Sequence, residues 1–228
     1  MRFTIINFTD PEKIKSLIDN LLTITRKRPA IVNQKESSIP NCDLIILPDE
    51  FRSFGGKVIT ERVLSSPIIK EVKNHIARGG AVLAINSGAE VLIDAQLVGA
   101  KIKRFNRHEN ATESVAVEIE RNVNSPFLKM YKQKEILRLC SYSLRDYFIL
   151  EPQDSNLINL NLVAFKYQVN KVQTEKLKID PENTGIAGIV SENGNILCSI
   201  PDPTVFNINN EKGNDPKLFF ENVVKTLS

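Results

Sequence analysis

Short apolar stretches alternate with amphipathic stretches through the first half of the chain. Apolar runs at 2–8, 29–32, 42–48 and 81–85 predict strands, and the run at 42–48 is continuously apolar, as in the middle of a parallel sheet. An amphipathic helix is expected to open at Asp10 and Pro11. Its buried face is expected to carry Ile14, Leu17, Ile18, Leu21 and Leu22. This alternation predicts a parallel sheet covered by helices on both faces.

End signals define a second helix before the strand at 81–85. Ser66 suits the N-cap, Pro67 the first helical position, and Gly79 the position beyond the last turn. The strand is followed by Asn86-Ser87-Gly88 and a segment of small residues that has the character of a helix start. We therefore expect a sharp strand-to-helix turn with Asn86 at its apex.

The second half of the chain has a different pattern. Residues 113–120 alternate with period two, which is typical of a strand with one exposed face. Further strands are expected within 136–143, 147–150, 162–167, 185–190 and 195–200, and an amphipathic helix at 219–227. The polar segment 168–183 is expected to be an exposed loop. We interpret this half as a mixed or antiparallel extension of the same sheet, so that residues 1–228 form a single domain.

Composition narrows the classes of partner. The net charge is only +3 and the lysines are dispersed, so we expect no nucleic acid among the partners; the basic run at 25–29 is interpreted as a solvated helix end. The cysteines Cys42, Cys140 and Cys198 are far apart and form no CxxC pair, so we expect buried thiols, no disulfide and no metal site. Neither a signal peptide nor a membrane span is predicted, which favours a cytoplasmic location.

The turn at Asn86 is where many α/β enzymes place a nucleophile. Asparagine cannot serve, because a carboxamide is neutral and cannot be activated by deprotonation near neutral pH. Ser87 is adjacent, but its side chain projects in another direction. The two histidines, His75 and His108, lie in a helix and a loop where we expect surface roles.

Carboxylates follow two of the predicted strands. Asp49 and Glu50 come after the strand at 42–48, and Asp202 follows the strand at 195–200. Ligand sites of α/β proteins form at such strand ends, and a pair of metal ligands is conceivable there, although exposed loop charges are the favoured interpretation. No phosphate-binding glycine motif is present, so no cofactor is predicted.

Several motifs together resemble the class I glutamine amidotransferases. The chain is similar, more narrowly, to the small glutaminase subunit of phosphoribosylformylglycinamidine synthase. The segment "CDLIILPDEFRSFGG" resembles that family's strand followed by P-G-G-F-S-Y-G-D, and "GGAVLAINSGAEVL" resembles its G-I-C-N-G-F-Q segment. The segment "GIAGIVSENGNILCSIPDPT" resembles its I-A-G-I segment that ends in M-P-H-P-E. The implied fold is three-layered α/β, flavodoxin-like, with a mostly parallel central sheet and an antiparallel extension.

In that family a Cys attacks the glutamine amide, a His acts as base and a Glu orients the His. The corresponding positions hold Asn86, Asp202 and Thr204, so the resemblance implies a degenerate triad. The oxyanion loop P-G-G-F corresponds to residues 48–51, the family's H-G-E-G segment to 142–145, and the Gln of the turn to Glu90. The pocket would be lined by Asp49, Glu50, Phe51, Ser87, Gly88 and Glu90.

Three functions remain open at this point. The resemblance favours a structural or regulatory subunit of a large synthetase of purine biosynthesis, without glutamine hydrolysis. The alternative is a small-molecule binding or sensing protein that reuses the pocket, whose carboxylates Asp49, Glu50, Glu90 and Asp202 favour a cationic ligand. A third possibility is an enzyme in which Ser87 or Asp202 has a new role.

Overall fold

The fold was analysed in a computed structural model of the chain. The structure describes residues 1–8, 14–49, 63–104, 113–120, 125–141, 146–150, 160–168, 185–205 and 215–228. Predictions that concern the helix start at Asp10, the polar segment 169–183, His108, and the pocket residues Glu50 and Phe51 therefore lie outside the described residues.

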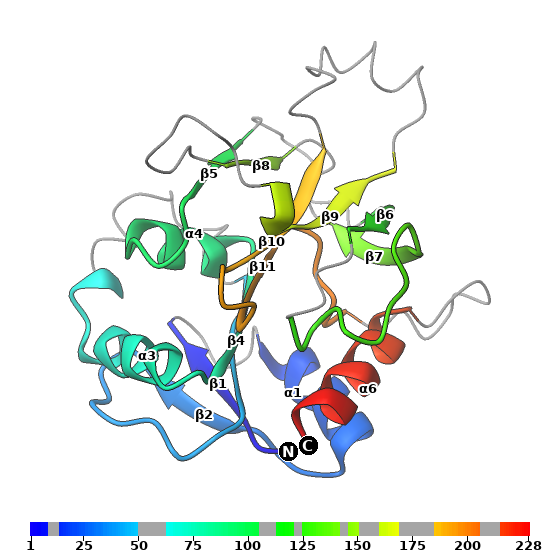
Figure 1. The fold of residues 1–228 in the computed structure, drawn as a ribbon. Coiled ribbons are helices and arrows are strands. Elements are labelled where there is room, and N and C mark those ends of the chain that lie inside the picture. The colour runs from blue at the N-terminus through cyan, green and yellow to red at the C-terminus, as the bar shows by residue number, and fades with distance from the viewer. Residues whose placement is uncertain are drawn as a thin grey trace.

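A nine-stranded sheet runs through the molecule in the order β2-β1-β3-β4-β11-β10-β9-β6-β7 (Figure 1). Its first five strands are parallel and the remaining pairings are antiparallel. The strands are β1 (Phe3–Asn7), β2 (Ala30–Asn33), β3 (Leu44–Leu47), β4 (Ala81–Ile85), β6 (Glu113–Ile119), β7 (Ile136–Ser141), β9 (Val163–Tyr167), β10 (Ile186–Val190) and β11 (Ile196–Ser199). A separate antiparallel pair consists of β5 (Ala100–Lys103) and β8 (Tyr147–Leu150).

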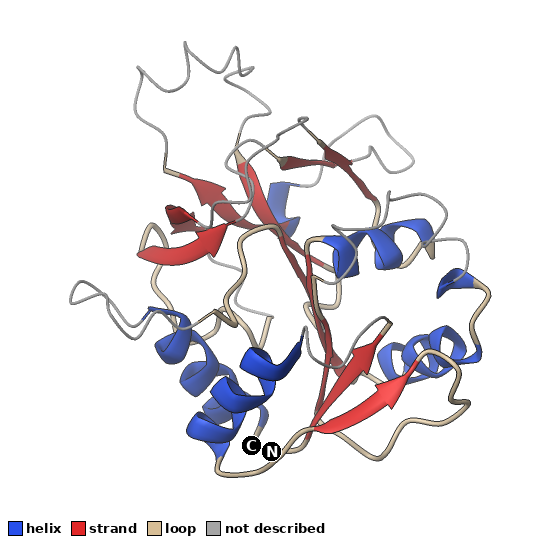
Figure 2. Cartoon of the chain, turned by 180° about the vertical axis from the view of Figure 1, so that it is seen from behind, coloured by secondary structure: helices blue, strands red, loops and turns tan. Residues whose placement is uncertain are grey.

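Helices cover both faces of the parallel half, which makes three layers (Figure 2). The helices α1 (Lys15–Thr25) and α6 (Asp215–Leu227) pack on one face, and α3 (Pro67–Ala77) and α4 (Ser87–Asp94) on the other. Successive residues of a strand point to opposite faces, so Leu44 and Ile46 join the first core and Ile45 joins the second. The predicted three-layer α/β fold with an antiparallel extension is confirmed.

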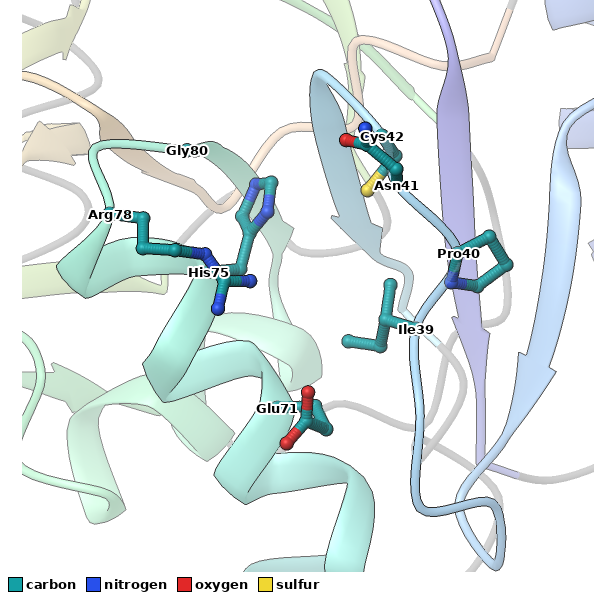
Figure 3. A pocket seen from close by; sticks show the side chains of 8 residues that line it. All are labelled: Ile39, Pro40, Asn41, Cys42, Glu71, His75, Arg78 and Gly80. Atoms are coloured by element: carbon teal, nitrogen blue, oxygen red, sulfur yellow. The ribbon is translucent and has the colours of Figure 1, made fainter.

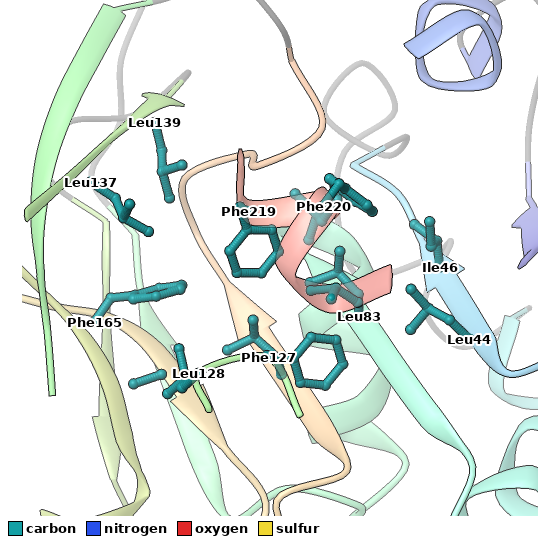
Figure 4. Packing of buried hydrophobic residues seen from close by; sticks show 14 of the residues in the cluster. Leu44, Ile46, Leu83, Phe127, Leu128, Leu137, Leu139, Phe165, Phe219 and Phe220 are labelled. Atoms are coloured by element: carbon teal, nitrogen blue, oxygen red, sulfur yellow. The ribbon is translucent and has the colours of Figure 1, made fainter. Parts of the chain in front are cut away.

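One core runs from the parallel half into the antiparallel half. Phe219 and Phe220 of α6 lie between side chains of β3 and β4 and side chains of β7 and β9 (Figure 4). The Phe219 ring meets Phe165 and Phe220 edge to face, with centroids 6.4 Å and 5.7 Å apart. Phe219 therefore contacts side chains that belong to both halves of the sheet.

The antiparallel strands curl back toward the centre of the sheet. Asp202, just after β11, forms an isolated antiparallel bridge with Cys140 of β7, and the Asp202 N–H donates to the Cys140 carbonyl at 2.6 Å. Gly188 of β10 allows the close packing inside this curl, because a Cβ there would lie 2.3 Å from the Phe165 ring. The segment that carries Asp202 is thus fixed between the two halves.

The residues predicted to mark the ends of α3 lie where they were expected, but one residue predicted on the buried face of α1 does not. Ser66 lies at the N-cap of α3 with Pro67 first in the helix, and Gly79 has a left-handed φ of 81°, as predicted. The Ser66 hydroxyl, however, accepts no capping hydrogen bond from the helix N–H groups, and it donates instead to the Val63 carbonyl. Leu22 was expected on the buried face of α1 and is 41% exposed, so that prediction is wrong.

His75 was expected at the surface, and this too is wrong. It is 8% exposed, and its Nε2 lies 3.1 Å from the Ala81 carbonyl oxygen, so Nε2 carries the proton of the neutral ring. A Cβ on Gly80 would approach the imidazole to 2.2 Å. Gly80, just before β4, therefore leaves room for the ring.

Candidate active site

The candidate site lies at the carboxyl edge of three neighbouring parallel strands. Asp49 follows β3, Asn86 follows β4, and Asp202 follows β11, and these strands are adjacent in the order β3-β4-β11. The Asn86 N–H donates to the Ser199 carbonyl at the end of β11, at 2.8 Å. Parallel strands bring such residues to one edge of a sheet, which is where α/β ligand sites form.

Asn86 has a strained backbone. Its φ of 47° and ψ of −100° lie outside the ordinary wells for an L residue, including the left-handed helical well. The turn leads directly from β4 into α4. Gly88 allows this turn to approach the backbone of β3 closely, because a Cβ on Gly88 would lie 2.3 Å from the Leu47 carbonyl oxygen. The predicted sharp turn with Asn86 at its apex is present.

The Asp49 carboxylate binds this turn. Its Oδ2 accepts a hydrogen bond from Asn86 Nδ2 at 3.1 Å, and its Oδ1 accepts from the Ser87 hydroxyl at 2.7 Å and the Ser87 N–H at 3.3 Å. The first backbone N–H groups of a helix have no partner inside the helix and favour a negative charge. Asp49 therefore acts as an acceptor for the start of α4 and for the Asn86 amide.

Arg104 completes the network from the other side. Its guanidinium donates to Asn86 Oδ1, to Glu90 from Nε at 2.9 Å, and to Asp146 at 2.9 Å. Burial opposes the charged form of Arg104, but its hydrogen bonds and charge contacts with Glu90 and Asp146 outweigh this, so the pKa of Arg104 is raised. The Asn86 carboxamide is consequently held at both ends, its nitrogen by a carboxylate and its oxygen by a guanidinium.

Sequence reasoning missed Arg104 and Asp146. Arg104 directly follows β5 and Asp146 directly precedes β8, and β5 was not predicted as a strand. The antiparallel pairing of β5 with β8 matches Lys103 with Tyr147, which brings the two flanking residues together. A pairing of strands so far apart in the chain leaves no local signal in the sequence.

Asp202 and Thr204 are both buried, and they are joined by hydrogen bonds. Asp202 Oδ1 accepts from the Thr204 N–H at 2.7 Å and from the Thr204 hydroxyl at 2.6 Å. The Thr204 carbonyl accepts from the Asn20 amide of α1 at 2.7 Å. These contacts give Asp202 the role of stabilising its own turn.

The cysteines offer poor nucleophiles. Cys42, Cys140 and Cys198 are free and buried, as expected. Burial raises the pKa of each thiol, and that of Cys198 to about 12, so the thiolate is scarce near neutral pH. Among the described residues no group of three or more His, Cys, Asp or Glu side chains could hold a metal ion.

A cavity of about 460 Å³ lies at the opposite edge of the sheet (Figure 3). Its lining includes Cys42, which precedes β3, Gly80, which precedes β4, and His75 and Arg78 from the end of α3. The amino ends of these strands face away from the carboxyl edge. This cavity is therefore separate from the candidate site.

Comparison with known proteins identifies the class. Residues 49–217 match the family described as the CobB/CobQ-like glutamine amidotransferase domain, and the chain belongs to this family. Among curated relatives, the phosphoribosylformylglycinamidine synthase subunit PurQ of Bartonella henselae is 25% identical over 99% of this chain and 98% of its own. That of Thermus thermophilus is 30% identical over 77% of each chain.

Solved structures agree on the fold. PurLQS from Thermotoga maritima superimposes with a TM-score of 0.74 at 20% identity, covering 100% of this chain and 99% of the other. A glutamine amidotransferase from the same organism gives a TM-score of 0.63 at 12% identity, with 100% and 97% covered. The predicted resemblance to the amidotransferases is confirmed. In the part of the chain that the structure describes, no helix is long and apolar enough to cross a membrane.

Proposed function

We propose that this chain is a PurQ-like subunit of a purine-biosynthesis synthetase that does not hydrolyse glutamine and has a structural or regulatory role in the cytoplasm. Its similarity to PurQ subunits extends over nearly the whole chain. The PurLQS structure, whose name joins PurQ to further components, suggests a large PurL-type subunit as the partner. The strained turn at the carboxyl edge corresponds to a nucleophile elbow.

The observation that carries the proposal is the state of Asn86. The apex of such an elbow needs a Ser, Cys or Thr that a nearby base can activate. Here the apex carboxamide is neutral, and Asp49 and Arg104 already hold its nitrogen and oxygen. The apex side chain therefore has contacts that stabilise the turn and no capacity for thioester formation.

The residues at the other triad positions support the same conclusion. Asp202 accepts two hydrogen bonds from Thr204, and both residues are buried. A carboxylate is a much weaker base than imidazole, and Thr204 carries no charge with which to orient a base. A glutaminase mechanism would need all of these roles to be filled at once.

The alternative of an acidic pocket for a cationic ligand has less support. Glu90 is paired with Arg104, Asp49 accepts hydrogen bonds from Asn86 and Ser87, and Asp202 accepts from Thr204. A cationic ligand would have to compete with these internal donors. We therefore favour the subunit role.

The test is reconstitution with the large subunit from the same genome. The chain and the PurL-type protein would be co-expressed with any small accessory subunit, and complex formation followed by co-purification and calorimetry. We expect a complex that amidates its ribonucleotide substrate with ammonia and not with glutamine. The Thermus thermophilus PurQ with its own partner is the positive control. Glutamine-dependent turnover would overturn the loss of hydrolysis, and absence of a complex would overturn the subunit role.

A further inference from the structure

The backbone at Asn86 holds the next peptide nitrogen close to the Asn86 side chain. Around the Cα–C bond of an L residue, Cβ lies about 120° from the amide nitrogen, so the ψ of −100° leaves roughly 20° between Cβ and the Ser87 nitrogen. A ring that joins the Asn86 Cγ to the Ser87 nitrogen requires this torsion to be near zero. Ordinary helix and strand values of ψ are far from that geometry.

One carboxylate contacts both nitrogens that such a ring closure involves. Asp49 Oδ1 accepts from the Ser87 N–H at 3.3 Å, and Asp49 Oδ2 accepts from Asn86 Nδ2 at 3.1 Å. Asp49 can therefore receive the proton of the attacking nitrogen and deliver one to the departing nitrogen. A positioned group of this kind acts first as base and then as acid.

Arg104 supplies the electrostatic component. Its guanidinium donates to Asn86 Oδ1, the oxygen on which negative charge develops when a nucleophile adds to Cγ. Glu90 and Asp146 fix this guanidinium in place. The Ser87 N–H lies at the start of α4, where no helical hydrogen bond uses it, so ring closure leaves the helix ladder intact.

We propose that Asn86 is a site of self-modification, at which the chain converts its own asparagine into a succinimide and releases ammonia. The Ser87 nitrogen passes its proton to Asp49 and forms a bond to Asn86 Cγ, while Arg104 stabilises the oxyanion. The Cγ–Nδ2 bond then breaks, and the leaving nitrogen takes the proton from Asp49 and departs as ammonia. Water later opens the ring at either carbonyl to give aspartate or isoaspartate at position 86. The modification is independent of any synthetase partner.

Peptide mass spectrometry of the full chain tests the proposal. Trypsin releases residues 79–101 as a peptide whose only asparagine is Asn86. After incubation of the folded chain at neutral pH, we expect this peptide to appear with the mass of one ammonia less, or with the amide replaced by a carboxyl group. A parallel incubation in heavy-oxygen water should place the label in the carboxyl product.

The decisive comparison is between the folded chain and the chain unfolded in urea. Asn124-Ser125 is a second Asn-Ser pair in the chain, and it reports the rate at such a pair in the unfolded chain. We expect Asn86 to react faster in the folded chain than in the unfolded one. A rate at Asn86 that falls on folding, or an intact Asn86 throughout, would overturn the proposal.

Variants separate the role of Asp49 from a general effect of folding. Asp49→Asn should slow the reaction in the folded chain by roughly 100-fold, the lower end of what a positioned acid–base group contributes. Glu118→Gln is the control. Glu118 lies on β6 and forms an ion pair with Lys134, so this substitution should leave the rate at Asn86 unchanged. Circular dichroism establishes that each variant is folded. A folded Asp49→Asn that reacts as fast as the parent would refute the assigned base; if it does not fold, the folded-to-unfolded rate ratio of the parent decides.

Discussion

The side-chain oxygen of Asn86 accepts a hydrogen bond from the guanidinium of Arg104, and this contact joins the sheet of nine strands to the separate β5–β8 pair. Arg104 also binds Glu90 of α4 and the nearly buried Asp146. Three segments that are distant in the chain, at 86–90, 104 and 146, are thus joined by one guanidinium, so its removal should affect stability as well as the site.

We predict that Arg104→Ala lowers the free energy of unfolding by about 1–3 kcal/mol, because it removes a charged donor from the 4%-exposed Asp146. Urea denaturation measures the loss. Lys134→Ala is the matched control, since Lys134 pairs with Glu118 and Glu120 at the surface and should contribute only ~0–1 kcal/mol. Equal losses of unfolding free energy in the two variants would show that the Arg104 contacts stabilise the fold no more than a surface ion pair does.

Gly88→Ala tests the close passage of the turn under β3. The added Cβ would meet the Leu47 carbonyl oxygen at 2.3 Å, and a backbone atom cannot rotate away. We expect a loss of roughly 1–3 kcal/mol, as in other overpacked sites. Gly79→Ala is the comparison: its φ is 81°, but no atom lies within 4 Å of the added Cβ, so it should cost only the conformational strain, about 1–2 kcal/mol. A thermal melt in which Gly88→Ala matches the parent would contradict the packing argument.

His75 should make the fold sensitive to mild acid. Burial lowers the pKa of His75 below its usual 6.5, although the hydrogen bond with Ala81 acts in the opposite direction. Below pH 6.5 the unfolded chain binds a proton that the folded chain does not, so stability is present above 6.5 and is lost as the pH falls toward the folded-state pKa.

The measurement is the melting temperature of the parent and of His75→Gln between about pH 7 and pH 5. Glutamine can retain a donor toward the Ala81 carbonyl but does not titrate. The parent should lose more stability than the variant over this interval. Parallel curves would show that His75 is not the titrating group.

Phe219 should be a principal contributor to the core that unites the two halves of the sheet. It is fully buried, and Phe219→Ala should lower the free energy of unfolding by about 3–5 kcal/mol. The adjacent Leu218 is 43% exposed, so Leu218→Ala should change stability by about 0.5 kcal/mol or less. Urea unfolding followed by fluorescence and circular dichroism would reveal whether the halves unfold together; separate transitions would contradict the single-domain prediction.

Most of the fold could be predicted because its signals are local. The apolar run before Asp49 predicted β3, and Ser66, Pro67 and Gly79 fixed the ends of α3. The errors arose where burial depends on neighbours. Leu22 has the spacing of a core residue but lies at the edge of the helix face, and His75 is polar but lies under Gly80 beside the Ala81 carbonyl.

The sequence by itself determined the layered α/β fold and the relationship to the amidotransferases, because strand periodicity, turn residues and motif spacing can be recognised along the chain. Only the tertiary structure decided which side chains surround the turn at Asn86. The side chain of Asn86 is bound from two distant places, by Asp49 after β3 and by Arg104 after β5. Strand pairing and the closure of long loops bring them together, and contacts of that kind depend on the whole fold rather than on any local stretch of sequence.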